Sequence, residues 1–171
     1  VLGMQKERKE TSASQLFKRL GKEFCNKIEA VCTDIWDPYL KSVRIHCPQA
    51  EVVFDKFHVY CFLSDAVDRT RRSEQQKATE EGYQVIKGSR WLWLKKPGIL
   101  QEHQKQTLRQ IMENNENLQK AYLLKEDFGQ LYACTNKEEG LKCFTEWIER
   151  CRESNLYHFQ RLARRLQRRL K

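Results

Sequence analysis

The first third of this chain has the pattern of a strand, a helix and a second strand, which limits the folds open to it. Two short apolar, β-branched runs, Ile28 to Thr33 and Glu51 to Phe54, predict buried strands. The segment 37–46 between them has apolar residues at helical spacing, with an Asp-Pro start and a Cys-Pro stop. Such a crossover normally makes its two strands parallel, so both should end at the same edge of a sheet.

The rest of the chain shows helical periodicity. Apolar residues from Val59 to Val67 predict a long helix that turns polar over 69–81, with a break near Gly88. The segment 90–96 (RWLWLKK) fits either a short strand or a helical turn. Further helices are expected upstream and downstream, and residues 1–4 are interpreted as the frayed end of another strand. The additional helices are expected over 14–24, 101–112, 117–132, 137–151 and 156–170.

These patterns predict an α/β to α+β fold. A small sheet should occupy residues 1–57, and a helical region should follow over residues 58–171. The 171 residues are 40% hydrophobic and 32% charged, which is the composition of a folded protein. No apolar run approaches the roughly 20 residues that span a bilayer, so membrane insertion and secretion are disfavoured.

Seven cysteines are scattered without a CxxC pair, which predicts reduced thiols in a cytoplasmic protein. The alternative is a metal site built from Cys47, His58 and Cys61, although a structural zinc site normally has four ligands in recognisable pairs. The chain has no GxSxG, P-loop, HExxH or GxGxxG motif. Acyl transfer, ATP hydrolysis, zinc proteolysis and dinucleotide binding therefore have no motif support.

The net charge of +9 is concentrated at the end of the chain. Residues 156–171 hold six cationic side chains and no acid, which leaves +3 for everything before them. A one-sided cationic surface is typical of proteins that bind a polyanion, because bound phosphates release their counterions. The alternative is a solubilising helix face. The predicted final helix buries Phe159, Leu162, Leu166 and Leu170, and presents Arg161, Arg164, Arg165, Arg168 and Arg169 as candidate DNA-binding residues.

A second basic cluster contains Arg69, Arg71 and Arg72. These arginines are candidates for contacts to DNA phosphates, or for salt bridges to Asp68 and Glu74 along one helix face.

Two tryptophans interleaved with basic residues offer another candidate surface. Trp91 and Trp93, flanked by Arg90, Lys95 and Lys96, suit either a stacking platform for an unpaired base or packing in the core.

Each predicted strand is followed directly by an aspartate, Asp34 after the first and Asp55 after the second. Open α/β sheets bind ligands at this edge, and carboxylate oxygens suit Mg²⁺. Asp34 is the first candidate for a catalytic and metal-binding residue, and Asp55 is a second candidate catalytic carboxylate. The alternatives are structural: Asp34 could cap the following helix, and Asp55 could cap the long helix or form an ion pair. His58 is a candidate base, metal ligand or structural histidine.

Several segments in order resemble bacterial insertion-sequence transposases of the ISL3 type: AVCTDIWDPYLKSV, HCPQAEVVFDKFHV, DAVDRTRR, KAYLLKEDF and FTEWIERC. The resemblance runs from about Leu16 to Arg169. It implies a DDE transposase, in which an RNase H-like domain carries three acidic residues that bind two Mg²⁺ or Mn²⁺ ions and cut and join DNA. It also implies an α-helical insertion after the second acidic residue. Asp34 falls where that residue is expected, and Asp55 is the other candidate.

The family's first and last acidic residues are expected outside this chain, which suggests an internal fragment of the catalytic domain that is inactive alone. The partner implied is DNA, namely the transposon ends, in a bacterial, cytoplasmic and nucleoid-associated setting without a membrane. Protein partners would be a second copy of the chain or the missing catalytic-domain segments. The alternative function is a non-catalytic nucleic-acid-binding or interaction module. RNA binding is a third hypothesis, supported only by the charge and the tryptophan pair.

Overall fold

The structure is a computed structural model that describes Glu7 and residues 9–169. The chain divides into two compact units, Val1–Cys61 and Phe62–Lys171. The strand expected over residues 1–4 lies outside the described residues. The described residues are mostly helical, with one small parallel sheet of two strands. This composition agrees with the predicted α/β or α+β class.

The first unit contains the predicted strand, helix and strand. Strand β1 (Ala30–Thr33) and strand β2 (Glu51–Phe54) are parallel, and helix α3 (Asp37–His46) connects them. The register pairs Ala30 with Glu51 and Thr33 with Phe54. Both strands therefore end together, as the sequence predicted.

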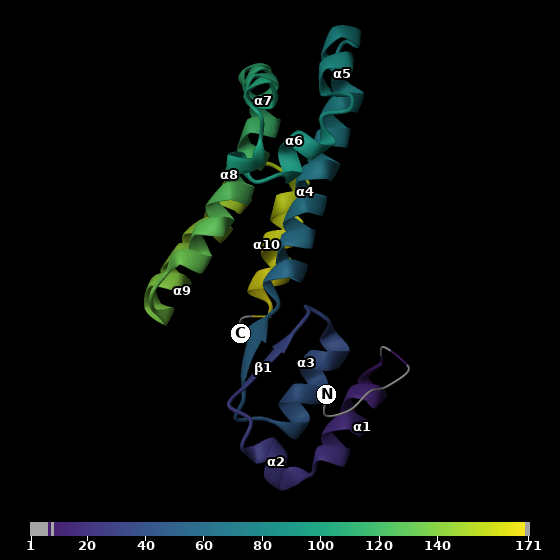
Figure 1. Cartoon of the computed structure of the whole chain (residues 1–171), viewed down its shortest axis with the longest axis vertical. Helices are drawn as coiled ribbons and strands as arrows, with labels where there is room; N and C mark the ends of the chain where they lie inside the picture. Colours follow the sequence, from purple (N-terminus) through teal and green to yellow (C-terminus); the bar gives the residue numbers. More distant parts are fainter. Residues whose placement is uncertain (1–6, 8, 170–171) are drawn as a thin grey trace. The chain divides into compact units, whose positions relative to one another are not determined.

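The helices of the first unit cover one face of this sheet (Figure 1). Helix α1 (Glu10–Leu20) and helix α2 (Lys22–Asn26) precede β1. The core beneath the sheet is formed by Cys25, Val43 and Cys47, with side chains of α1 and of the strands packed around them. The alternating pattern leaves Cys32 and Val53 exposed on the other face, so the prediction that both strands are buried was wrong: the described helices of this unit cover only one side of the sheet.

A single helix over 14–24 was predicted, and the structure shows two. The break falls at Gly21, whose φ is 83° and ψ is 156°. This backbone conformation is accessible almost only to glycine. The apolar periodicity continues across the break, so the pattern alone does not reveal it.

Every regular element of the second unit, within residues 62–169, is a helix. Helix α4 (Lys56–Lys77) contains the boundary between the units and ends before residue 79, earlier than the break predicted near Gly88. Thr79 starts a new helix because its hydroxyl oxygen accepts a hydrogen bond from Gly82 N at 3.4 Å. The following elements are α5 (Glu80–Ile86), α6 (Arg90–Leu94), η1 (Pro97–Ile99), α7 (Glu102–Asn114), α8 (Glu116–Gln130), η2 (Leu131–Ala133), α9 (Lys137–Glu153) and α10 (Tyr157–Gln167).

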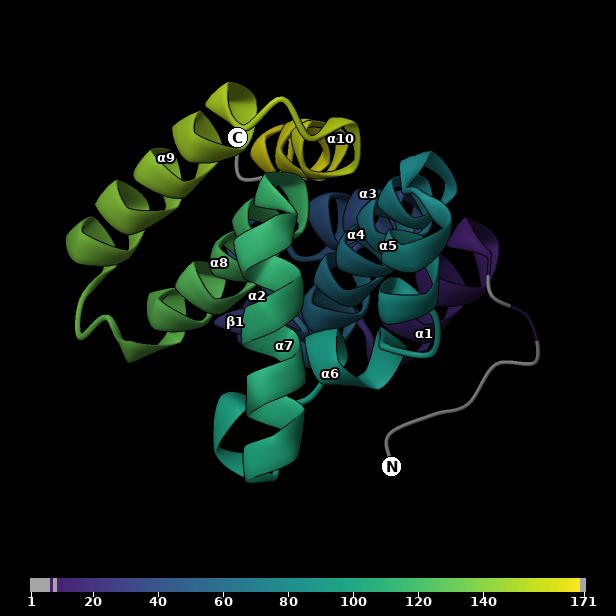
Figure 2. The same cartoon turned by 90° about the horizontal axis from the view of Figure 1, so that it is seen from above.

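Helices α7, α8 and α9 lie in succession, and α10 folds back along α9 (Figure 2). Two tryptophans anchor their core. Trp93 is fully buried and donates from Nε1 to Ser89 Oγ at 2.9 Å, whereas Trp147 donates from Nε1 to the carbonyl oxygen of Leu124 at 2.8 Å. These bonds satisfy the buried ring N–H groups. No helix within residues 9–169 is long and apolar enough to cross a membrane.

Candidate nucleic-acid interface

Helix α10 divides into an apolar and a cationic face. Phe159, Leu162 and Leu166 are buried, as their spacing predicted, and Leu170 lies outside the described residues. Arg161 and Arg164 are exposed. The apolar face thereby fixes the direction in which the arginines project.

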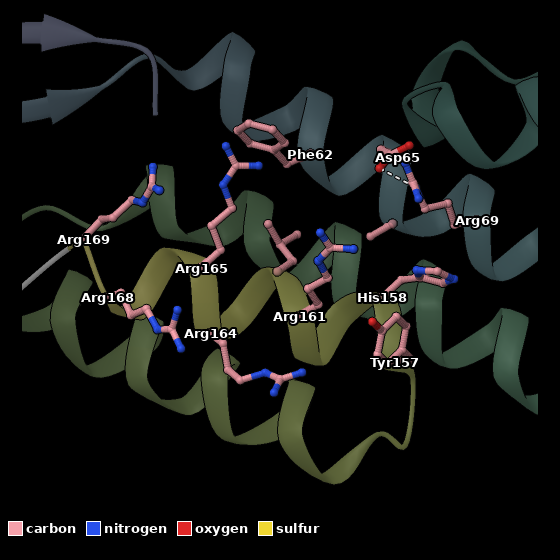
Figure 3. A pocket seen from close by; sticks show the side chains of 12 residues that line it. Phe62, Asp65, Arg69, Tyr157, His158, Arg161, Arg164, Arg165, Arg168 and Arg169 are labelled. Carbon is pink, nitrogen blue, oxygen red and sulfur yellow. Dashed lines mark hydrogen bonds and ion pairs between the residues drawn. The ribbon is translucent and has the colours of Figure 1, made fainter. Parts of the chain in front are cut away.

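The cationic face of α10 lines a groove against the stretch of α4 within the second unit (Figure 3). The groove encloses a cavity of about 720 Å³. Six arginines and one acidic residue line it. We call this the α4/α10 groove; its lining residues are Phe62, Asp65, Ala66, Arg69, Tyr157, His158, Arg161, Leu162, Arg164, Arg165, Arg168 and Arg169.

Two contacts organise the α4 side of the groove. The guanidinium carbon of Arg165 lies 3.9 Å from the centroid of the Phe62 ring, in a cation–π contact. Arg69 Nε donates to Asp65 Oδ2 at 2.7 Å, and both side chains are more than half exposed. The structure therefore brings Arg69 together with the arginines of the final helix, about ninety positions further along the chain.

His158 is the one imidazole among the lining residues of the α4/α10 groove. Burial lowers the pKa of His158, and the positive charges of Arg69 and Arg161 lower it further, while Asp65 opposes them. The neutral form of His158 is thus favoured by its surroundings.

Of the groove residues, the sequence predicts Arg69 and the arginines of the final helix as binding residues, but not Phe62, Asp65 and Ala66 of α4, nor Tyr157 and His158. Their signal is a helical stripe: Phe62, Asp65 and Arg69 recur at three- and four-residue spacing, as do Tyr157 and Arg161. The spacing can be read from the sequence, but the sequence does not show that the α4 residues face α10.

The three arginines of the basic cluster on α4 have different surroundings in the structure: Arg69 lines the groove, whereas Arg71 and Arg72 do not. Arg71 and Arg72 both bind Asp68, with N–O distances of 2.9 and 2.6 Å, and neither lines the groove. The side chains of Asp68 and Arg71 are only 6% and 9% exposed. Of the two acidic partners predicted for these arginines, Asp68 forms the ion pairs with Arg71 and Arg72. Glu74 pairs with Lys77 instead.

The two tryptophans also separate. Trp93 belongs to the core, which confirms the packing alternative for that residue. Trp91 is 61% exposed, and the Arg90 guanidinium carbon lies 5.2 Å from its ring centroid. The segment is a short helix, α6, rather than a strand.

In the first unit, Asp34 and Asp55 follow the paired positions Thr33 and Phe54 at the end of the sheet. Asp34 lies in the turn that leads into α3, where its carbonyl oxygen accepts a hydrogen bond from Trp36 N at 2.8 Å. The cap position of α3 is Trp36 rather than Asp34. The side-chain Oδ1 of Asp34 is buried.

Asp55 has the structural role that was considered as its alternative. Its Oδ1 accepts a hydrogen bond from Phe57 N at 2.8 Å at the start of α4, and its Oδ2 lies 3.0 Å from His58 Nδ1. The Phe57 hydrogen bond, and then the His58 contact, lower the pKa of Asp55. The carboxylate is therefore held in its charged form as the cap of α4.

The donor chemistry of this edge partly suits a divalent metal. Carboxylate oxygens are the ligands that Mg²⁺ prefers, and Asp34 stands at a rigid strand end. Both oxygens of Asp55 already make contacts. Within residues 9–169 no three His, Cys, Asp or Glu side chains group closely enough to hold a metal, and the seven cysteines are free thiols. Asp34 fits as one ligand of a site, not as a whole site.

Comparison with known proteins identifies the family. The sequence pattern of the ISL3-type DDE family, described as transposase, matches residues 1–171. The chain is 27% identical over 169 residues to the transposase for insertion sequence element IS1001 of Bordetella parapertussis, covering 97% of this chain and 42% of that protein. It is 29% identical over 175 residues to the transposase for IS1557 of Mycobacterium tuberculosis, covering 89% and 39%.

The chain thus spans about two fifths of the length of these curated relatives. No solved structure matches it. The match over its whole length, together with the two related transposases, shows that this chain belongs to the ISL3-type family of insertion-sequence transposases.

Proposed function

We propose that the chain contributes the DNA-binding surface and one metal-binding carboxylate to a DDE transposase, whose parent reaction is metal-dependent cleavage and transfer of DNA strands. The observation that carries the DNA-binding part is the convergence of six arginines on the α4/α10 groove with a single carboxylate among them. Such a charge excess attracts phosphates and releases their counterions.

The residues proposed to bind DNA are Arg69, Arg161, Arg164, Arg165, Arg168 and Arg169. Arg71 and Arg72 are given a structural role in this proposal, because both form ion pairs with the buried carboxylate of Asp68 and neither lines the groove. Every groove residue lies in the second unit. The cluster of arginines therefore also supports the alternative function, a non-catalytic nucleic-acid-binding module.

For the first unit, we propose that the sheet is part of an RNase H-like core and that Asp34 is one of its metal ligands. When bound, Mg²⁺ or Mn²⁺ would polarise phosphate oxygens and supply an activated water. Asp34 would orient the ion from the end of β1, and Asp55 would support the strand end by capping α4. The remaining carboxylates, and a second copy of the chain or further segments, belong to the complete transposase in this proposal, which acts on DNA in the cytoplasm.

DNA binding is tested by measuring affinity for a duplex against salt concentration. Replacing Arg164, Arg165 and Arg168 with Gln should reduce the salt slope by about 0.9 for each phosphate that the variant no longer neutralises. A matched control removes three positive charges outside the groove, at Lys105, Arg109 and Lys142. An unchanged slope in the first variant, or an equal reduction in the control, would contradict the assignment of the groove.

The metal role is tested with supercoiled plasmid and Mg²⁺ or Mn²⁺. We expect no nicking by this chain alone, because two-metal cleavage needs more carboxylates than Asp34 and Asp55 supply. Robust nicking abolished by Asp34→Asn would overturn that expectation. The complete transposase carrying Asp34→Asn should lose cleavage while its duplex affinity is unchanged. If cleavage persists, Asp34 is not a metal ligand and the module alternative is favoured.

A further inference from the structure

The α4/α10 groove contains aromatic rings as well as cations. Tyr157 is the first residue of α10 and is 60% exposed, although it begins a helix whose apolar residues are otherwise buried. Its ring meets the edge of the His158 ring at a centroid distance of 5.3 Å. Figure 3 shows both side chains beside Arg69 and Arg161 at one end of the groove.

Further along the groove, around Phe62, the arrangement is different (Figure 3). There the Phe62 ring is covered by the Arg165 guanidinium at 3.9 Å, so that ring is already occupied. Tyr157 is thus the aromatic side chain of the groove with the largest exposed surface. An aromatic face next to guanidinium groups is the combination that binds bases and phosphates of unpaired nucleic acid.

An exposed aromatic ring among the arginines of the groove favours a single strand over a duplex. In a duplex the faces of the bases are stacked on one another, so that only phosphates and groove edges reach a concave protein surface. A single strand can place a phosphate on the arginines and turn a base toward Tyr157. From Tyr157 to Arg168 the helix rises about 16 Å, at about 1.5 Å per residue, which offers room for several phosphate contacts.

Trp91 is the competing platform in this unit. Its ring is exposed, but it lies on α6, it already contacts the guanidinium of Arg90, and it does not line the groove. Tyr157 is distinguished by its position at the end of a continuous row of arginines.

We propose that the α4/α10 groove binds single-stranded DNA, with the ring of Tyr157 stacking on an unpaired base while the arginines bind neighbouring phosphates. This inference rests on the proposed DNA-binding function and specifies its substrate: a strand end or unpaired segment rather than an intact duplex.

The test uses the full chain and fluorescence anisotropy with labelled oligonucleotides of about 20 nucleotides. The probes are a thymidine strand, an abasic strand of the same length, a duplex, and an RNA strand of uridine. Tyr157→Ala should weaken binding to the thymidine strand by about five- to a hundredfold, as loss of one stacked base predicts. It should leave the abasic strand and the duplex unaffected. Tyr157→Phe should retain wild-type affinity because it keeps the ring.

The matched control is Tyr83→Ala, which removes an exposed tyrosine on α5 outside the groove and should change nothing. An unchanged affinity of Tyr157→Ala for the thymidine strand, with duplex binding intact and dependent on Arg164, overturns the inference and leaves the proposed function standing. Absence of binding to every probe overturns both. Tighter binding of the RNA strand than of the DNA strand overturns the choice of DNA.

Discussion

The guanidinium group of Arg165 lies over the ring of Phe62, with 3.9 Å between its central carbon and the ring centroid. The contact joins α10 to α4 within the groove, between Arg161 on one side and Arg168 and Arg169 on the other (Figure 3). It also explains why Arg165 is less exposed than Arg161 and Arg164 on the same helix. A residue predicted only to bind DNA thus also holds two helices together.

We expect the Arg165 and Phe62 contact to stabilise the fold by about 1 kcal/mol. A double-mutant cycle with Phe62→Leu and Arg165→Gln, followed by urea unfolding, isolates this coupling from the other interactions of each residue. Leucine keeps most of the apolar volume and removes the ring. Additive effects of the two substitutions would show that the contact contributes nothing.

Asp68 should be the most costly carboxylate of α4 to remove. Its side chain is 6% exposed and binds Arg71 and Arg72, so Asp68→Asn leaves Arg71 as a buried, unpaired charge and should cost about 3 kcal/mol. The control is Asp65→Asn, which breaks the exposed pair with Arg69 and should cost less than about 1 kcal/mol. Equal free energies of unfolding for the two variants would contradict this prediction.

Asp68 should also make the free energy of unfolding depend on pH in the acidic range. Burial raises the pKa of Asp68, but hydrogen bonds and charges from Arg71 and Arg72 outweigh burial and lower it overall. A carboxyl whose pKa is lowered by folding stabilises the protein above its unfolded pKa, and this stability is lost as pH falls through the folded pKa. Urea unfolding between about pH 5 and pH 2 should show a smaller acid dependence in Asp68→Asn than in the wild type.

His158 should couple DNA binding to pH. Burial and the charges of Arg69 and Arg161 lower the pKa of His158 in the free protein, and Asp65 from α4 opposes them. A phosphate in the groove would favour the protonated ring and raise that pKa. Affinity should therefore increase as pH falls from 8 to about 6, by up to about tenfold for each pKa unit gained on binding. The readout is Kd at constant ionic strength, and His158→Gln should abolish this increase.

Gly21 should be intolerant of a side chain. Its φ of 83° with ψ of 156° strains any L-residue, so Gly21→Ala should destabilise the protein by about 1 to 3 kcal/mol. Gly140, inside α9, is the matched control, because an added Cβ meets only Cys134 Cβ at an ordinary 3.9 Å. Gly140→Ala should stabilise by about 0.5 to 1 kcal/mol in the same urea unfolding assay.

Local sequence patterns are enough to predict the separate helices and strands and the faces that they bury. Short β-branched runs and a helical period of 3.6, with Pro at the helix boundaries, predicted β1, α3 and β2 and the common edge that carries Asp34 and Asp55. The apolar stripe of α10 likewise predicted which of its residues would be buried. These features depend on neighbours within a few residues, so the chain displays them directly.

Which helix faces pack against one another depends on long-range packing. Arg69 and Arg165 look equivalent to Arg71 in the sequence, yet the first two line a groove and the third is buried against Asp68. The contact between Phe62 of α4 and Arg165 of α10 joins residues about a hundred positions apart, and no local periodicity encodes such a pairing. The role of each arginine follows from the packing of distant helices, which is determined by the shape of the whole core.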